Sequence, residues 1–201
     1  ITAPNDSGIH LLTLRTKAGK IIDRYYYIIT SNPDPHGIIG EVNYQPVKTG
    51  DKIDFWCSTP NQTLYYSWNN NTALSLEEDY ISTDSLGEGL NILHLYQMTN
   101  ESWYNSSYEI WIDNTSPEIT LNYDNYSNIS SGEYLTLLTN EDISGAYFSW
   151  DGLSYSKIFS KFIPVPLING TKNLTLKVID LAGNINITSF TYTIVNSSTT
   201  F

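Results

Sequence analysis

The chain has 201 residues, with 21 acidic and 10 basic side chains and a formal net charge of −11 at pH 7. This balance excludes the basic surface that nucleic acids require, and it disfavours binding to anionic membrane surfaces. A hydrophobic content of 40%, with 16 Tyr and 5 Trp, suits packed cores and excludes a disordered chain. No apolar run approaches the length of about 20 residues that a membrane-spanning helix needs.

The single cysteine, Cys57, excludes a fold that is held together by intrachain disulfides. Cys57 follows Ile53 and Phe55 in a run that alternates with polar residues, so it shares their face of a strand. We therefore predict a buried, unreactive thiol.

Residues 1–32 are predicted to form a β-hairpin, the last two strands of a unit whose earlier strands are absent. Tyr25, Tyr27 and Ile29 lie opposite the inward-facing set of this segment, so the hairpin is apolar on both faces. A pair of strands is marginally stable by itself. We therefore expect either a further domain upstream, in a longer chain, or pairing with a second chain.

Two Pro-containing links then divide the chain. Asn32-Pro33-Asp34-Pro35 and Asn114-Thr115-Ser116-Pro117 both interrupt strand patterns, because proline removes a donor and stiffens the backbone. The predicted domains are 33–114 and 115–196, followed by a tail at 197–201. Their predicted strands lie near 38–44, 52–58, 63–68, 72–77, 90–98, 104–113, 118–123, 133–139, 145–150, 155–162, 172–179 and 185–195.

The same unit recurs along the chain. Segments 7–32, 89–114 and 171–196 align at a common offset of 82 residues, and Tyr66-Ser67-Trp68 falls on Phe148-Ser149-Trp150 at the same offset. An offset shared along a whole unit indicates an internal repeat. Strands of five to nine residues in a unit of about 80 predict tandem antiparallel β-sandwiches, an all-β fold.

The motifs of the last unit resemble the tandem immunoglobulin-like repeats of bacterial and archaeal cell-surface and S-layer-type proteins. Phe148-Ser149-Trp150-Asp151-Gly152, the run from Leu174 to Asn184 and the link Asp113–Pro117 carry this resemblance. It implies Ig-like sandwiches that serve as spacers, stalks, lattice units or adhesive modules. The first full unit departs from it, because Thr99-Asn100-Glu101 replaces Leu-Ala-Gly in the turn.

The densest chemical signal is the N-glycosylation motif Asn-x-Ser/Thr, which occurs twelve times. With 20 Asn and 43 Ser plus Thr, random placement would give about four such motifs. Two positions are expected to be poor acceptors, Asn114 in a tight link and Asn186 on an inward-facing strand position. The other predicted acceptors are Asn5, Asn61, Asn70, Asn100, Asn105, Asn125, Asn128, Asn169, Asn173 and Asn196.

The evidence for cofactors in the sequence is slight. Asp142, together with Glu141, and Asp180, near Asn184, are weak candidates for calcium ligands, because carboxylate oxygens suit this ion. A simpler interpretation of Asp180 is a side chain that caps the turn ending at Asn184. The three His residues lack zinc-ligand spacing, and no motif of nucleophilic, phosphate-binding or paired-carboxylate catalysis is present. We therefore expect a protein that is not an enzyme and needs no cofactor, except that calcium remains a candidate.

Together these features predict an N-glycosylated structural or assembly component of an extracellular surface layer, stalk or filament. Its partners would be copies of itself or neighbouring Ig-like domains, and residues 1–32 could donate strands to another subunit. One alternative is an adhesin or carbohydrate-binding module that uses Trp56, Trp103, Trp111, Tyr25 and Tyr27, if these rings face solvent. The other is a non-catalytic spacer of a larger secreted enzyme.

Overall fold

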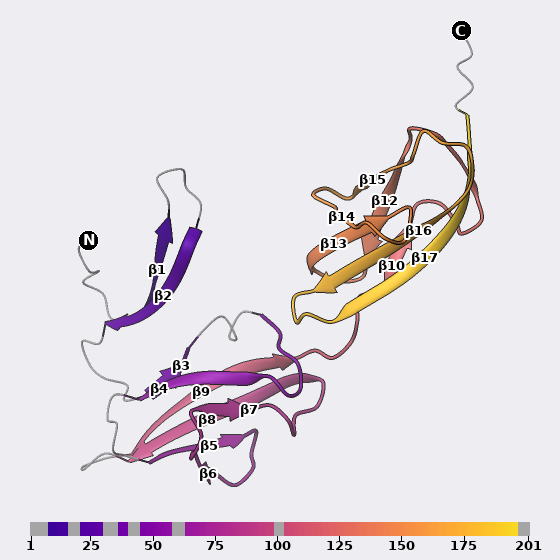
Figure 1. Ribbon diagram of the computed structural model, residues 1–201. Helices are drawn as coiled ribbons and strands as arrows, with labels where there is room; N and C mark the ends of the chain where they lie inside the picture. The colour runs from indigo at the N-terminus through magenta and orange to yellow at the C-terminus, as the bar shows by residue number, and fades with distance from the viewer. Residues whose placement is uncertain are drawn as a thin grey trace. The chain divides into compact units, whose positions relative to one another are not determined.

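The computed structural model describes residues 8–15, 21–29, 36–39, 45–57, 63–98 and 103–196, with side chains from Gly37 onward. Within these ranges every regular element is a β-strand, which confirms the predicted all-β class (Figure 1). The chain divides into two compact units, Ile1–Ile112 (unit 1) and Asp113–Phe201 (unit 2). The part of the chain described contains no helix that is long and apolar enough to cross a membrane.

Unit 1 contains a separate two-stranded antiparallel sheet and a pair of larger sheets. The larger sheets have the strand orders β3-β4-β7 and β6-β5-β8-β9. The strands are β1 (Gly8–Arg15), β2 (Ile21–Ile29), β3 (His36–Ile38), β4 (Lys52–Cys57), β5 (Leu64–Trp68), β6 (Leu74–Ser75), β7 (Tyr80–Ser82), β8 (Gly89–Met98) and β9 (Trp103–Ile112).

Unit 2 is built from two sheets with the strand orders β10-β12-β15 and β11-β17-β16-β13-β14 (Figure 1). All its pairings are antiparallel except that of β11 with β17. The strands are β10 (Ile119–Leu121), β11 (Asn128–Ser130), β12 (Tyr134–Thr139), β13 (Ile143–Ser149), β14 (Ser156–Lys157), β15 (Phe162–Pro164), β16 (Gly170–Asp180) and β17 (Ile185–Val195).

Both units have the architecture of an immunoglobulin-like sandwich, in which two β-sheets pack face to face. Apart from β1, β2 and β11, the first, second and fifth strands of each unit form one sheet, and the third, fourth, sixth and seventh form the other. The fourth strand therefore pairs with the third, whereas in constant-type domains it belongs to the sheet of the first strand. In unit 2, β11 is an extra strand that joins the start of the domain to its last strand in parallel. Unit 1 has a single parallel bridge, between Val47 and Ile112, at the corresponding place. The prediction of tandem Ig-like sandwiches is therefore confirmed at the level of fold.

The two cores are made from the inward faces of the alternating strands. Ile53, on β4, and Leu135, on β12, are fully buried in their own units, as are Ile81 and Ile163. The remaining buried hydrophobic residues of unit 1 include Leu93, Leu95, Ile110 and Ile112, and those of unit 2 include Leu174, Leu176, Tyr192 and Ile194.

A tryptophan links the two sheets in each unit. The Nε1 of Trp68 donates to the carbonyl of Ser82 at 3.2 Å, and that of Trp150 donates to the carbonyl of Pro164 at 2.9 Å. A buried indole N–H needs such a partner. Trp68 is buried, whereas Trp150 is half-buried at the margin of its core.

The prediction of one strand at 155–162 is wrong. β14 and β15 belong to different sheets, so the chain crosses between them at residues 158–161. Pro164 and Pro166 lie after this crossing rather than within it. The short strands β7 and β11 were not predicted, because three residues are too few to show alternation.

The N-terminal hairpin is present as the pair β1–β2, with Gly8 opposite Ile29 and a shift of register between Leu14 and Arg15. The link at residues 32–35 lies outside the described residues, and nothing is described of the side chains of Tyr25 and Tyr27. Cys57 is half-buried rather than enclosed, and its sulfur accepts a hydrogen bond from Nε2 of Gln97 at 2.8 Å.

Candidate functional site

Three carboxylates meet at one end of unit 2. One oxygen from each of Asp113, Glu141 and Asp180 lies within 4.8 Å of the other two. Asp113 is the first residue of the unit, Glu141 lies between β12 and β13, and Asp180 ends β16. The fold thus brings together three acidic groups that are distant in the sequence, and we call them the acidic cluster.

Asp180 holds the centre of this cluster. Its Oδ1 accepts the backbone N–H of Asn184 at 2.8 Å, and its own N–H donates to the carbonyl of Asn184 at 3.1 Å. The carboxylate therefore caps the β16–β17 turn, as the sequence suggested. Asp180 is nevertheless fully buried, and its second oxygen, Oδ2, has no hydrogen-bond partner among the described residues.

The segment that begins unit 2 is tied to the start of β17. Nδ2 of Asn184 donates to the carbonyl of Asp113 at 2.8 Å, and Nδ2 of Asn186 donates to that of Pro117 at 2.7 Å. The hydroxyl of Ser116 donates to the carbonyl of Ile185 at 3.2 Å. Residues 113–117 are therefore part of the unit, and their position holds the Asp113 carboxylate beside that of Asp180.

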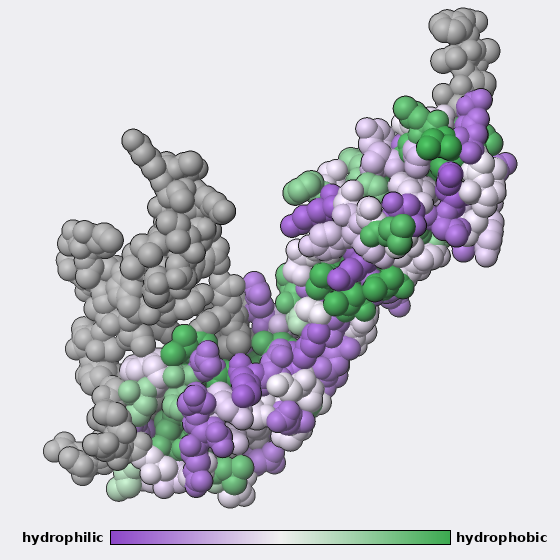
Figure 2. Space-filling view, viewed as in Figure 1, coloured by the Kyte–Doolittle hydropathy of each residue, from purple (hydrophilic) through white to green (hydrophobic). Residues whose placement is uncertain are grey.

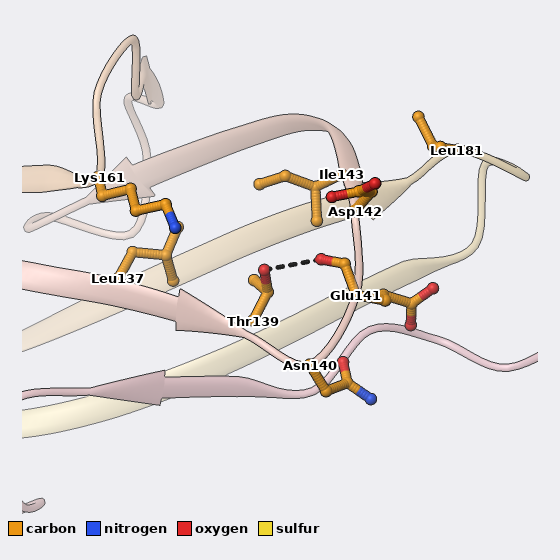
Figure 3. Close-up of a pocket in the computed structure, with 8 residues that line it drawn as sticks. All are labelled: Leu137, Thr139, Asn140, Glu141, Asp142, Ile143, Lys161 and Leu181. Atoms are coloured by element: carbon orange, nitrogen blue, oxygen red, sulfur yellow. Dashed lines mark hydrogen bonds between the residues drawn. The ribbon is translucent and has the colours of Figure 1, made fainter.

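A hollow of about 700 Å³ adjoins the acidic cluster and includes Glu141 in its lining (Figure 3). The Thr139 hydroxyl donates to the carbonyl of Glu141 at 2.8 Å, which fixes this loop. Figure 3 shows the carboxylates of Glu141 and Asp142 pointing in different directions, and the Lys161 ammonium on the far side of Thr139 from the Glu141 carboxylate. Asp142 is exposed and does not belong to the acidic cluster.

Sequence reasoning found part of this cluster. It named Asp142 with Glu141, and Asp180 near Asn184, as oxygen ligands. The structure brings Glu141 and Asp180 to Asp113, whereas Asp142 lies outside the cluster. Asp113 was missed because the run Asp113–Pro117 was interpreted only as a link between domains. Its position one residue after a long amphipathic strand gave no sign that its carboxylate would face a turn near residue 180.

The glycosylation motifs lie mostly on exposed side chains. Nine of the twelve asparagines are described, and eight of them are exposed: Asn70, Asn105, Asn114, Asn125, Asn128, Asn169, Asn173 and Asn196. Asn5, Asn61 and Asn100 lie outside the described residues. The exception is Asn186, which is half-buried and whose amide donates to Pro117.

Two of the exposed asparagines also make structural hydrogen bonds. Oδ1 of Asn125 accepts the N–H of Thr191 at 2.7 Å, and Oδ1 of Asn173 accepts the Thr191 hydroxyl at 3.0 Å. Both bonds use the amide oxygen, so the amide nitrogen, to which a glycan is attached, is not engaged by them. Asn186 differs because its bond uses that nitrogen.

The Phe148–Gly152 motif ends strand β13 and forms the turn that follows it. Oδ1 of Asp151 accepts the N–H groups of Leu153 and Ser154 and the hydroxyl of Ser149, each at 2.8 Å. These hydrogen bonds stabilise the ionised carboxyl and lower the pKa of Asp151 to about 2. This carboxylate organises a turn, and the motif therefore specifies structure rather than chemistry.

The aromatic residues proposed for carbohydrate binding differ in exposure. Trp103 and Trp111, both on β9, are 60% and 55% exposed. The ring of Trp103 lies 6.0 Å from that of Tyr65, so the outer face of the β6-β5-β8-β9 sheet carries neighbouring aromatic side chains. Trp56 is half-buried with its Nε1 enclosed, so the expectation that it faces solvent is wrong.

Unit 2 also exposes large hydrophobic side chains. Tyr134 and Phe162, on adjacent strands, are 60% and 56% exposed, and their rings make an edge contact at 6.3 Å. Figure 2 shows hydrophobic side chains at several separate places on the viewed face of this unit, with hydrophilic ones between them. Scattered exposure of this kind does not by itself define a binding surface.

No family model and no curated protein matches the sequence. Among solved structures, fibronectin(III)-like modules of Clostridium thermocellum CbhA are 14% identical, with a TM-score of 0.46 over 83% of this chain and 97% of theirs. Three N-terminal domains of the outer capsid protein Hoc of bacteriophage RB49 are 11% identical, with a TM-score of 0.43 over 79% and 58%. A Bacteroides ovatus protein, SGBP-B, in complex with a mixed-linkage heptasaccharide, is 13% identical, with a TM-score of 0.31 over 94% and 55%. These likenesses are too low to assign a function to this chain.

Proposed function

We propose that this chain is a non-catalytic, N-glycosylated stretch of an extracellular surface protein, in which tandem Ig-like units serve as structural elements of a surface layer, stalk or filament. The observation that carries the proposal is the exposure of the acceptor asparagines. Eight of the nine described ones are exposed, although the fold has ample inward-facing positions. An acidic, glycan-covered sandwich stays soluble and shields its strand edges.

Intact-mass measurement and peptide mapping of the protein from its native source test this proposal. We expect a mass above 22.7 kDa for these residues, with glycans on several exposed asparagines and none on Asn186. An unmodified mass for every mapped peptide would contradict glycosylation and remove the main support for an extracellular location.

A matched pair of variants makes the test specific to one site. Thr171→Ala removes the motif of Asn169 without altering the asparagine, whereas Thr171→Ser retains the motif. Thr171 is exposed, so neither change disturbs the core. In the native host the first variant loses the mass of one glycan and the second does not.

The same proposal includes assembly through the N-terminal hairpin. β1 and β2 form a two-stranded sheet of their own, and an isolated pair of strands gains stability by adding to another sheet. We propose that residues 1–32 donate these strands to a neighbouring subunit. Deleting them is expected to abolish concentration-dependent assembly in analytical ultracentrifugation, and unchanged assembly would exclude strand donation.

A second candidate function is carbohydrate binding on the outer face of the β6-β5-β8-β9 sheet. The exposed rings of Trp103 and Trp111 support it, because aromatic rings stack on the apolar faces of sugars. Glycan-array binding that is lost in Trp103→Ala and Trp111→Ala would favour this function. Phe159→Ala, a change of an exposed ring in unit 2, is the matched control.

A further inference from the structure

We propose that unit 2 binds one calcium ion at the acidic cluster of Asp113, Glu141 and Asp180. This inference does not depend on glycosylation or on assembly. It depends on three observations: the spacing of the carboxylates, the unpartnered oxygen of Asp180, and the hydrogen bonds that hold the three segments in place.

The spacing fits a single cation of this size. Calcium is bound by six to eight oxygen atoms at about 2.3–2.6 Å, so two of its ligands can be at most about 5 Å apart. The three carboxylate oxygens lie within 4.8 Å of one another. This spacing is close to that of three ligands of one calcium ion.

The buried oxygen of Asp180 needs a partner that the described residues do not supply. Asp180 is fully buried; Oδ1 receives the N–H of Asn184, and Oδ2 receives no hydrogen bond. A buried charged oxygen without a partner is unfavourable. In this turn Oδ2 is enclosed, and one oxygen of the same carboxylate lies within 4.8 Å of an oxygen from each of Asp113 and Glu141.

Charge and ligand chemistry together select calcium. Three carboxylates at this spacing repel one another, and a divalent cation among them converts the repulsion into attraction. The ligands are all hard oxygen atoms without histidine or cysteine, which disfavours zinc. Magnesium requires an almost regular octahedron and gives up its waters reluctantly, so a site formed by three separate segments suits calcium better.

The site is held by bonds that do not involve the metal. Asn184 holds Asp180 and Asp113 in place. Its backbone N–H donates to the Asp180 carboxylate, and its side-chain amide donates to the carbonyl of Asp113. The Thr139 hydroxyl fixes the backbone of Glu141. Binding of the ion would therefore fasten the entry segment 113–117 to the β16–β17 turn of the same unit.

Isothermal titration calorimetry of the 201-residue chain with CaCl₂, after treatment with a chelator and at constant ionic strength, tests the proposal. We expect one ion per unit 2, with a dissociation constant of about 10⁻⁴–10⁻³ M or lower, the range of extracellular modules. Calcium should also raise the melting temperature of unit 2, which thermal unfolding experiments measure.

Glu141→Gln and Asp113→Asn are the main variants, because both side chains are only half-buried and the changes preserve size. Each should weaken binding at least about tenfold, since affinity follows the number of charged ligands. Asp180→Asn should do the same, and circular dichroism shows whether it still folds. Asp142→Asn, an exposed neighbour outside the acidic cluster, should bind as the parent protein does.

Three results would overturn the proposal. The first is the absence of calcium binding by the folded parent protein at 10 mM, about ten times the weakest expected dissociation constant. The second is an equal loss of affinity in Asp142→Asn and Glu141→Gln, which would indicate general attraction to an acidic surface. The third is equal affinity for magnesium and calcium, which would contradict the assignment of the ion.

Discussion

Units 1 and 2 have the same strand order, yet their ends differ in chemistry. Applying the offset of 82 residues to Asp113 and Glu141 gives Ser31 and Thr59. For β8 and β16 the offset is 81 residues, because Leu93 pairs with Tyr108 as Leu174 pairs with Phe190. This offset places Thr99 at the position of Asp180. Hydroxyls thus replace all three carboxylates in the sequence of unit 1.

Some features are common to both units, and the acidic cluster is found in unit 2. The buried aliphatic positions and the tryptophan with its carbonyl partner occur in both units, so they belong to the sandwich itself. Among the described residues such a cluster occurs in unit 2 alone, and the aligned sequence of unit 1 lacks its carboxylates, so the sandwich does not need it. A feature that the fold does not need is a better candidate for function than one that is shared.

The largest expected effect concerns the shared cores. Leu95→Ala in unit 1 and Leu176→Ala in unit 2 each remove a fully buried side chain, and each should lower the free energy of unfolding of its own unit by about 2–5 kcal/mol. Calorimetry with chemical denaturation measures both. A cost below 1 kcal/mol in one unit alone would break the equivalence of the cores.

A smaller effect is expected from the anchor of the entry segment. Asn184→Ala removes a buried amide and leaves the carbonyl of Asp113 without that partner, so unit 2 should lose about 1–3 kcal/mol. Unit 1 should unfold as before. Asn196→Ala, an exposed position past β17, is the control. An unchanged unit 2 would show that the hydrogen bond from Asn184 to Asp113 contributes nothing to its stability.

The tryptophan pair offers a finer comparison. Trp68→Phe and Trp150→Phe delete the indole donors to Ser82 and Pro164, and each should cost about 1–2 kcal/mol. The cost should be greater in unit 1, because Trp68 is 6% exposed and Trp150 is only half-buried. The reverse order in urea unfolding would show that the hydrogen-bond length, 3.2 against 2.9 Å, matters more than burial.

The smallest effect is a difference in acid sensitivity. Asp151 has a pKa of about 2 in the folded unit, below its ordinary value of 3.8, so its contribution to stability is complete above that ordinary value and is lost as the pH falls through 2. Asn69 stands at the corresponding position of unit 1 and does not titrate. The melting temperatures of the parent and Asp151→Asn should therefore converge in unit 2 as the pH falls from about 5 to 2. A constant difference would contradict this role of the carboxylate.

The elements that the sequence predicted well are the long alternating ones. β8, β9, β16 and β17 have ten or eleven residues each, and period-two alternation over this length leaves little ambiguity. β7 and β11 have three residues each and depend on their partners for their conformation, so no local pattern revealed them. The error at 155–162 arose because the chain changes sheet there while its composition still favours a strand.

The acidic cluster, too, could be predicted from the sequence only in part. The turn-capping role of Asp180 was predictable, because it depends on residues four positions apart. Its approach to Asp113, 67 positions away in the sequence, depends on the side chain of Asn184 reaching the entry segment. Contacts of that range follow from the packing of the whole unit and leave no trace in the spacing of neighbouring residues.

The parallel pairing of β11 with β17 has a mechanical consequence. Near one end of unit 2 the N–H of Tyr126 donates to the carbonyl of Thr191, and further along the N–H of Ser131 donates to that of Val195. Tension applied through the N-terminal and C-terminal sides of the unit pulls two parallel strands in opposite directions, so these bonds would be loaded together in shear rather than opened one after another. In the described part of unit 1 a single bridge, from Val47 to Ile112, lies at this place, and unit 1 should yield at the lower force.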